Sequence, residues 1–526
     1  MSDSAERSKS GFWGPAAGIF AGAVLMFFTV RWILAKKPEY NWISEGTVKT
    51  ASYIFAVAGF AAVSFFILKV RGRLKAETLF IILYLLFGLS YMAVSPLSSV
   101  PDETEHMLRT YGITLGDFIP PVNDMGEGGS YVPENLIYMW DRSGTRLRYM
   151  SDNFTMKASE YQVFLTYSNT AFYSPLTYLP QAVGVLLTRL VCNRPYVIAY
   201  VGRLFELVAS GILIYYAIKL MPFGKNILLI LSLLPMNMYE CASLSGDGMA
   251  YAVTLLIIAY CLWLRVEKEG RMSTRDIVFL YILLALVASC KIVYAPFVLM
   301  AFIIPAERFG SRKEYAAHIT CAGIMIFLLA VVWPMGIGSR YLLEYTEGVS
   351  AGEQVKYVIT HPASFLQVMI YTLIEEGEWL FKTYFAASLS YFSVGCNILV
   401  IFVSAAGLIY VCFTEKIIRC EDETGLKIWK RPSVILGLAT FVSVIFTFLS
   451  LYIEWTPYRA GTVQGLQGRY FIPLTFQAVY LFKKKYDRIS GSTDDKEGAG
   501  LIIALPAILM CMANLMVIIT LFVNYV

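Results

Sequence analysis

The sequence predicts an all-α protein that crosses a membrane many times, and three observations support this fold class. Hydrophobic residues make up 57% of the 526 residues, whereas charged residues make up only 15%. The mean hydropathy of +0.60 is too high for a water-soluble domain of this length. Long apolar runs recur along the chain, and a helix needs about 20 such residues to cross a bilayer. Backbone groups in lipid must pair within their own segment, so these runs are expected to be helices.

Thirteen apolar runs are interpreted as transmembrane helices. They cover residues 13–35, 50–69, 77–97, 196–219, 225–240, 248–265, 277–290, 292–304, 315–337, 387–412, 433–452, 470–484 and 500–522. The first run is too long for the core of a signal peptide, so we interpret it as a retained anchor. In the segment 175–190, Pro175, Pro180 and Arg189 interrupt the apolar pattern. We therefore expect that segment to be an interfacial helix that does not cross.

Basic residues in short connectors predict the orientation, because Lys and Arg favour the cytoplasmic side. Such residues recur at 69–75, 219–225, 265–275, 308–313, 416–431 and 483–485. With a cytoplasmic N-terminus and no crossing at 175–190, all six connectors are cytoplasmic, and only Lys36 and Lys37 fall on the wrong side. The expected location is the plasma membrane, with extracytoplasmic loops at about 98–195, 338–386 and 453–469. If 175–190 crossed, every later connector would invert.

The predicted organisation has three parts. Residues 1–76 hold two helices and a cytoplasmic loop, residues 77–485 form the membrane core with its external loops, and residues 486–526 hold a cytoplasmic loop and the last helix. The net charge of +5 is spread over separate connectors, so no nucleic-acid partner is expected. The nine cysteines form no CxxC pair and are interpreted as small apolar core residues.

An acidic turn after the third predicted helix is the first candidate site. Pro101, Asp102, Glu103, His106 and Arg109 lie within two helical turns. One interpretation is a capped helix at the membrane surface whose charges are solvated. The other is a carboxylate that deprotonates an acceptor hydroxyl or holds a divalent cation, Mg²⁺ or Mn²⁺, beside a lipid phosphate. With only three histidines in the chain, a zinc site is less expected.

Two further candidates lie inside predicted helices. Arg203 and Glu206 are three residues apart, so they could form an internal ion pair, or Arg203 could instead bind a lipid phosphate. Asp247 precedes a helical run, where it could act as an N-cap, and it could also face a cavity. Both roles can coexist.

Two more cationic positions lie near expected helix ends. Lys291 separates two apolar runs, and a break there would bring its ammonium near a phosphate, whereas on a continuous helix it would snorkel. Arg469 and Tyr470 begin the segment QGRYFIPL, where Gly465 and Gly468 allow close backbone approach. They form either an anion site at a helix N-terminus or an interfacial anchor.

Several motifs carry a resemblance to a known family. Pro101, Asp102, Glu103, His106, Arg109 and Tyr111 resemble the signature P-x-D-E-x-x-H-x-x-R-x-Y, apart from one position of spacing. YSPLTYLPQAVG (173–184), GRLFELVAS (202–210), LPMNMYECASLSGDGMAYA (234–252) and QGRYFIPL (467–474) follow in order. Together they resemble a family of bacterial predicted membrane proteins of unknown function, over residues 77–485. That family is similar to the C-type glycosyltransferases, integral membrane enzymes that take a sugar from a polyprenyl-phosphate carrier on the outer face of the membrane.

The resemblance implies a GT-C-like fold and a function. An acidic residue in the first large external loop would act as base or metal ligand, and the matching positions are Asp102 and Glu103. An arginine at the position of Arg203 is typical of the family. The partners implied are a polyprenyl-phosphate sugar donor, an envelope glycan or lipid acceptor, and membrane lipids.

The expected function is therefore a membrane glycosyltransferase, with Asp102 and Glu103 as catalytic residues. The expected substrate-binding residues are His106, Arg109, Arg203, Asp247, Lys291, Arg469 and Tyr470. Asp102, Arg203, Asp247 and Arg469 are predicted to line one cavity. The alternative is a lipid-linked glycan transporter or a non-catalytic scaffold for envelope polysaccharide assembly. A transporter is expected to carry polar residues throughout the membrane on several helices, whereas here they concentrate at one side.

Overall fold

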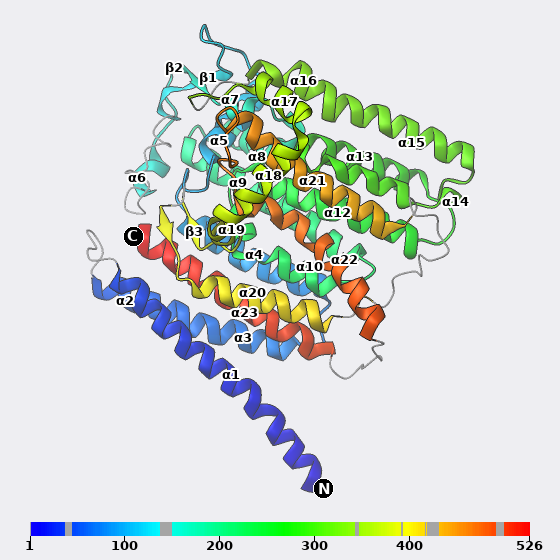
Figure 1. Ribbon diagram of the computed structural model, residues 1–526. Helices are drawn as coiled ribbons and strands as arrows, with labels where there is room; N and C mark the ends of the chain where they lie inside the picture. The colour runs from blue at the N-terminus through cyan, green and yellow to red at the C-terminus, as the bar shows by residue number, and fades with distance from the viewer. Residues whose placement is uncertain are drawn as a thin grey trace.

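The computed structural model describes residues 2–36, 45–136, 150–341, 347–390, 393–415, 417, 431–490 and 499–525. Of the predicted connectors, Lys37, residues 416 and 418–430, and the polar stretch 491–498 lie outside the described residues. Long helices run alongside one another between two ends of the molecule (Figure 1). We call the end that carries residues 97–136 and 150–194 the loop end, and the opposite end the connector end.

Eight helices among the described residues are long and apolar enough to cross a membrane. They are Ala17–Ala35 within α1 (Ser2–Ala35), Glu45–Val70, Ala76–Val94 (α4), Pro195–Leu220 (α9), Gly246–Val266 (α12), Arg312–Gly336, Pro432–Glu454 (α21) and Ile503–Tyr525 within α23 (Ala499–Tyr525). The second combines α2 (Glu45–Tyr53), η1 (Ile54–Ala58) and α3 (Gly59–Val70), and the sixth combines α15 (Arg312–Phe327), η6 (Leu328–Val332) and α16 (Trp333–Gly336). The prediction of a mostly helical, multi-pass membrane protein is thus confirmed, with eight spans in place of thirteen.

The other five predicted helices are shorter or interrupted. Residues 225–240 form α10 (Lys225–Ser232) and α11 (Pro235–Cys241), because Pro235 has no N–H and cannot continue a helix. Residues 277–290 fall in α13 (Thr274–Cys290), one residue short of the 18 taken as a span, and residues 292–304 form a 3₁₀-helix, η5 (Ile292–Ile303). Residues 387–412 hold a small hairpin of β3 (Ser388–Leu389) and β4 (Val394–Gly395) before α20 (Leu399–Thr414). Residues 470–484 divide between η10 (Gly468–Phe471) and α22 (Ile472–Ser490).

A bent helix pair lies in the second predicted external loop. The chain bends by 107° between α17 (Ala351–Thr360) and α18 (Pro362–Glu375). The two helices would form a ninth span if they cross the membrane as one broken helix. Pro362 at the start of α18 separates them, because the residue before a proline disfavours the helical conformation. A short helix, α19 (Gly377–Tyr384), follows and packs against η10.

The loop end holds a small irregular subdomain. It contains α5 (Glu103–Leu115), β1 (Gly129–Pro133), α6 (Met150–Thr155), β2 (Gln162–Thr166), α7 (Ser168–Ala171), η4 (Pro175–Tyr178) and α8 (Leu179–Val191). Strands β1 and β2 pair antiparallel, with Gly129 opposite Thr166. The short 3₁₀-helix η7 (Gly338–Tyr341) joins this subdomain through the Tyr341 hydroxyl, which donates to the carbonyl of Pro120.

Helix α8 packs on the first half of α9, where Gly184 contacts Phe205 and Gly202 contacts Val185. The guanidinium of Arg203 in α9 binds the carbonyls of Ser95 and Pro96, which directly follow α4. The end of α4 and the start of α9 therefore lie at the same end of the molecule. The segment between them, including 175–190, leaves and returns without a net crossing, as the orientation argument requires.

The short basic connectors contact one another at the connector end. Arg265 donates to the carbonyl of Ile303, and Arg308, at the end of α14 (Ala306–Phe309), donates to that of Gly270. Helices α4, α9 and α12 run from the loop end to the connectors at 69–75, 219–225 and 265–275, which therefore lie at the opposite end. The two groups of loops are thus separated as their charge pattern predicts.

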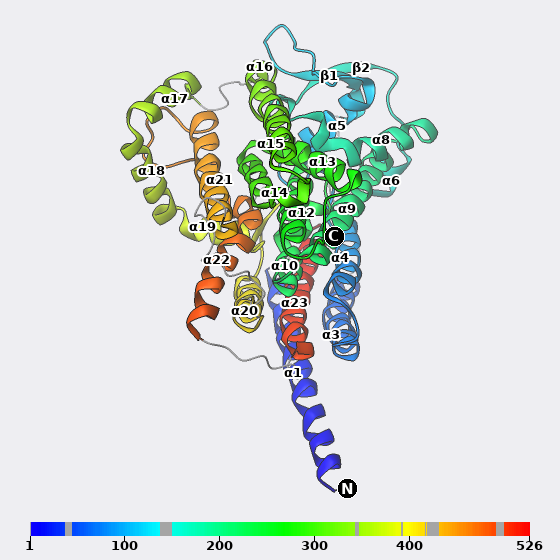
Figure 2. The same ribbon diagram turned by 90° about the vertical axis from the view of Figure 1, so that its right-hand side faces the viewer.

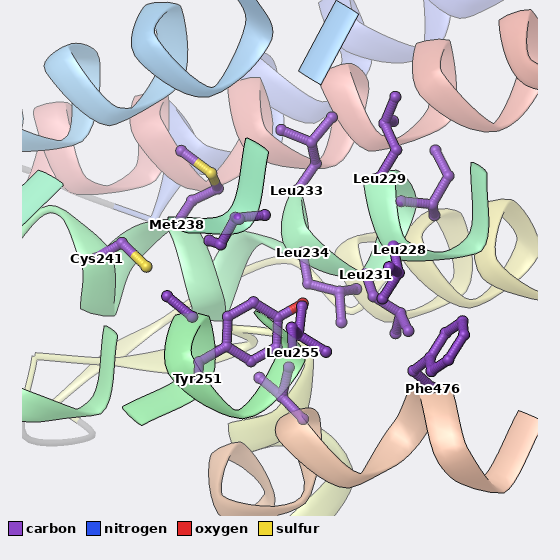
Figure 3. Close-up of a cluster of buried hydrophobic side chains, with 14 of the residues drawn as sticks. Leu228, Leu229, Leu231, Leu233, Leu234, Met238, Cys241, Tyr251, Leu255 and Phe476 are labelled. Carbon is purple, nitrogen blue, oxygen red and sulfur yellow. The ribbon is translucent and has the colours of Figure 1, made fainter. Parts of the chain in front are cut away.

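The core lies where α10 and α11 pass between longer helices. Figure 3 shows Leu228 and Leu231 of α10, Met238 of α11, Tyr251 of α12 and Phe476 of α22 in one apolar cluster, and all five are buried. The spans in α12 and α23 are 83% buried, whereas the span from α15 to α16 is only 11% buried and lies at the edge of the bundle (Figures 1 and 2). Its exposed apolar side chains form a surface suited to membrane lipid.

Candidate functional site

Charged side chains from separate segments meet at the loop end. The guanidinium of Arg469 forms ion pairs with Glu240 and with Asp102, the latter at 3.4 Å, and lies 3.9 Å from Asp247. The ammonium of Lys291 is 2.6 Å from the other oxygen of Asp247. Asp247 therefore bridges the two cations, and five charged groups form one cluster.

Each member of the cluster lies at or beside a helix end. Asp102 precedes α5 with a left-handed backbone (φ 62°), which Asp tolerates better than most residues. Asp247 lies in the first turn of α12, where the Ser245 hydroxyl accepts from the Asp247 amide and provides the N-cap. The N-cap role considered for Asp247 thus belongs to Ser245, and the Asp247 carboxylate binds Lys291.

The helix break expected at Lys291 is present, since α13 ends at Cys290 and η5 begins at Ile292. The ammonium lies 4.5 Å from the ring centre of Tyr470, and the guanidinium carbon of Arg469 lies 5.3 Å from it. Both cations thus interact with the face of one aromatic ring. Close packing holds this segment, because an added Cβ at Gly468 would overlap the backbone of α19.

A cavity of ≈640 Å³ opens beside the cluster. This volume is within the range of about 300–1,000 Å³ that is usual for small-molecule sites. Of the predicted site residues, Asp102, His106, Lys291 and Tyr470 line it. Arg469 and Asp247 contact these lining residues through their ion pairs. The remaining walls come from α7, η5, η7, α17, the last two turns of α21 and the loop before η10.

Two titratable neighbours in α5 are held in their neutral forms near pH 7. Burial lowers the pKa of His106 to about 4, and its Nδ1 lies 2.7 Å from the Tyr178 hydroxyl. Burial, together with the nearby Asp102 charge, raises the pKa of Glu105 to about 8. The charge beside the cavity is therefore carried by the five-residue cluster and not by these two side chains.

Glu103 and Arg203 form a second, separate ion pair. The guanidinium donates two hydrogen bonds of 2.6 Å to the carboxylate, which also accepts from the amides of Ser98 and Leu244. Both side chains are at most 1% exposed, and neither lines the large cavity. Arg203 therefore pairs with Glu103 and not with Glu206, and the expectation that it lines a common cavity with Asp102 is not met.

Arg109 also lies away from the cavity. Its guanidinium is fully buried and donates to the carbonyls of Asp117, Phe118 and Tyr173. These bonds hold the chain after α5 against the segment after α7. The interpretation of the acidic turn as a helix with solvated charges is wrong for Glu103, His106 and Arg109, because all three are buried.

The predicted metal pair has a different geometry from the one expected. Both oxygens of Glu103 are engaged by Arg203 and by two backbone amides, so Glu103 does not join Asp102 around an open position. In the described part of the chain, no group of three or more His, Cys, Asp or Glu side chains is arranged to hold a metal ion. Asp102, with 42% of its side chain exposed, is the carboxylate of the pair that faces the cavity.

Two acidic residues of this region were not predicted from the sequence. Glu240 pairs with Arg469, and Glu454 lines the cavity at the end of α21. A sequence signal existed for Glu240, because a carboxylate within an apolar run requires a partner. Glu454 adjoins Trp455 at a helix end, a pattern equally typical of an interfacial anchor.

The fold and site define a class: a multi-pass membrane protein with a charged cavity at one end of its helices. The chain belongs to the family described as "Predicted membrane protein (DUF2142)", which matches residues 85–477. This range contains both ion-pair systems and the loop-end subdomain, and the expected membership of a family of predicted membrane proteins of unknown function is confirmed. Comparisons with curated proteins and with solved structures found no significant match.

Proposed function

We propose that this protein is a membrane glycosyltransferase that moves a sugar from a polyprenyl-phosphate donor to a cell-envelope acceptor. The observation that supports this proposal is the placement of Lys291, Arg469 and Asp102 beside one cavity. The proposal places this cavity on the extracytoplasmic face of the plasma membrane, because the described basic connectors lie at the opposite end. The similarity expected between this family and the C-type glycosyltransferases supports the same assignment.

The donor phosphate binds to the two cations. Arg469 supplies a planar fork and Lys291 a compact ammonium, and both form strong charge-assisted hydrogen bonds with phosphate oxygens. Phosphate must displace a carboxylate from this cluster. Asp102 is the best candidate, because its side chain is the most exposed of Arg469's three carboxylate partners, whereas Asp247 is also held by Lys291 at 2.6 Å.

Displacement leaves Asp102 able to act as a base. Its carboxylate takes the proton of an acceptor hydroxyl while the hydroxyl oxygen attacks the anomeric carbon of the donor sugar. The bond between that carbon and the phosphate oxygen breaks, and its electron pair leaves with polyprenyl phosphate. Lys291 and Arg469 stabilise the negative charge on the leaving phosphate. Glu103, held by Arg203, supports α5 from behind so that Asp102 faces the cavity.

The test uses purified protein in lipid and a panel of polyprenyl-phosphate sugars, with carrier release followed with and without Mg²⁺ or Mn²⁺. Wild type is compared with Asp102→Asn and with Asp124→Asn, an exposed aspartate of the same loop segment. We expect one donor to release its carrier, and the Asp102 variant to lose at least about a hundredfold in rate, as removal of a base commonly does. The Asp124 variant should match wild type.

Absence of release from every donor would contradict the glycosyltransferase proposal. If an intact lipid-linked glycan then moved across the membrane of vesicles that contain the protein, the protein would be a transporter. If neither carrier release nor glycan movement were observed, the non-catalytic scaffold would be the function that remains. A metal requirement in the release assay would assign Asp102 as a metal ligand.

A further inference from the structure

A second wall of the cavity carries oxygen atoms that can accept hydrogen bonds but receive none from the described residues. Asn169 Oδ1 and Gln467 Oε1 are buried and have no hydrogen-bond partner among the described residues. Glu454 lines the same cavity, and no described residue forms an ion pair or hydrogen bond with its carboxylate. These acceptors come from α7, α21 and the loop before η10. We call Asn169, Glu454 and Gln467 the acceptor wall.

Buried oxygen atoms without donors are unfavourable, so the acceptor wall suits a ligand that brings its own donors. A phosphate diester offers only acceptor oxygens and therefore does not fill it. A carbohydrate offers several hydroxyl groups around one ring, and each can donate to a separate oxygen. The oxygens belong to three different segments, so a ligand with spread donors fits them better than one compact ammonium group.

Aromatic side chains border the acceptor wall. Trp455 follows Glu454 directly, lines the cavity and is 37% exposed. Phe172, Tyr173 and Tyr341 line the cavity as well. Flat apolar ring faces beside polar atoms are suited to a pyranose, which has C–H groups on its faces and hydroxyls at its rim.

The acceptor wall adjoins the cation cluster. Gln467 precedes Arg469 by two residues, and both residues lie just before α22, which begins at Ile472. Tyr173 and Lys291 line the same cavity as Glu454 and Gln467, and the Lys291 ammonium is 2.6 Å from Asp247. A sugar held on the acceptor wall would thus lie beside the position proposed for the donor phosphate.

We propose that the acceptor wall binds the acceptor of the transfer reaction and that this acceptor is a neutral carbohydrate. This inference rests on the proposed glycosyltransferase function for its role, but not for the binding itself. Glu454 accepts a hydrogen bond from a sugar hydroxyl, and Asn169 and Gln467 accept from neighbouring hydroxyls. Asp102 then takes the proton of the hydroxyl that reacts.

The test measures binding without turnover. Neutral mono- and disaccharides are titrated against the full-length protein in lipid nanodiscs, and binding is followed by saturation-transfer NMR. The variants are Glu454→Gln and Gln467→Met, which keep side-chain size but remove an acceptor, and the control is Glu375→Gln, an exposed glutamate of α18. Thermal unfolding of each variant is compared with wild type, so that lost binding is not confused with lost folding.

We expect at least one neutral saccharide to bind to wild type. Glu454→Gln should weaken that binding by at least about tenfold, since one of the two acceptor oxygens is replaced by an amide group that cannot accept. Gln467→Met should weaken it in the same direction, whereas Glu375→Gln should not. Binding of polyprenyl phosphate alone should remain unchanged in both wall variants.

The outcomes separate this inference from the proposed function. Carrier release by wild type without binding of any neutral saccharide, or with binding of amines only, would overturn the carbohydrate acceptor and leave the glycosyltransferase proposal intact. Equal saccharide affinity in wild type, Glu454→Gln and Gln467→Met would overturn the wall as the site. Saccharide binding that depends on Glu454, without release from any donor, would support the carbohydrate site and contradict the transferase function.

Discussion

Replacement of Glu103 by Gln tests how the loop end is held against the membrane helices. The Glu103 carboxylate receives two hydrogen bonds of 2.6 Å from Arg203 and one each from the amides of Ser98 and Leu244. Both charged groups are buried, so Glu103→Gln leaves the Arg203 guanidinium without a counter-charge. Breaking one partner of a buried pair costs about 3–5 kcal/mol. We expect a loss of that order in the free energy of unfolding.

The assay is unfolding of the purified protein in detergent, monitored by circular dichroism. A double variant, Glu103→Gln with Arg203→Met, should recover part of the loss, because the unpaired charge is removed together with its partner. The control is Glu378→Gln, which breaks an exposed ion pair with Lys382 within α19. That variant should unfold like wild type, since exposed pairs contribute little.

The result that would refute this reasoning is normal stability in Glu103→Gln. If the variant also lost carrier release, Glu103 would be a catalytic residue, as the sequence motif implies. If stability falls as expected, while Asp102→Asn unfolds like wild type, the two neighbouring carboxylates have different roles.

Two further predictions follow from the geometry of the site. Gly468→Ala would bring a Cβ into the Leu380 carbonyl and the Tyr384 amide, so α19 and η10 must separate; we expect a lower melting temperature and loss of carrier release, measured on the purified variant. Glu105 has a folded-state pKa of about 8, above its ordinary value of 4.5, so its contribution to stability is fully present below about pH 4.5 and is lost progressively as the pH rises to about 8. Glu105→Gln should therefore flatten the decline in stability, most clearly between about pH 7 and about pH 8, where His106 is neutral in both folded and unfolded states. An unchanged pH profile in that variant would contradict the assignment.

The length of each apolar run predicts most of the long helices, because the backbone groups of every segment in lipid must pair within that segment. It fails at residues 225–240, where Pro235 divides a largely apolar run, and at residues 292–304, where a 3₁₀-helix replaces an α-helix. In both places the chain is enclosed by other helices, which satisfy its packing without a continuous span. Burial by protein and burial by lipid look alike in a single sequence.

Several residues of the candidate site carry local sequence signals, but their pairings do not. Helix breaks at Asp102, Lys291 and Arg469 carry local signals, and the structure places all three beside one cavity. Arg203 has a local partner by spacing, Glu206, yet it binds Glu103, which is 100 positions away. A contact at that separation depends on how α4, α5 and α9 meet, and no local periodicity encodes it.

The two oxygens of Asn169 and Gln467 illustrate the same limit. Asn169 carries no signal in the sequence, and Gln467 is only the first residue of the segment QGRYFIPL, with no role assigned to its side chain. These two oxygens become notable only in the fold, which buries them beside the cavity without a hydrogen-bond donor to either. Such groups are found only when the hydrogen bonds of every buried polar atom are known from the three-dimensional structure.

The most direct test of the central claim is an experimental structure of the protein in lipid with polyprenyl phosphate bound. The proposed function predicts the phosphate within about 2.7–3.2 Å of the Lys291 ammonium and the Arg469 guanidinium, with Asp102 turned away from Arg469 and toward the cavity. Phosphate bound at another place, with the ion pairs of Arg469 and Lys291 intact, would contradict the account.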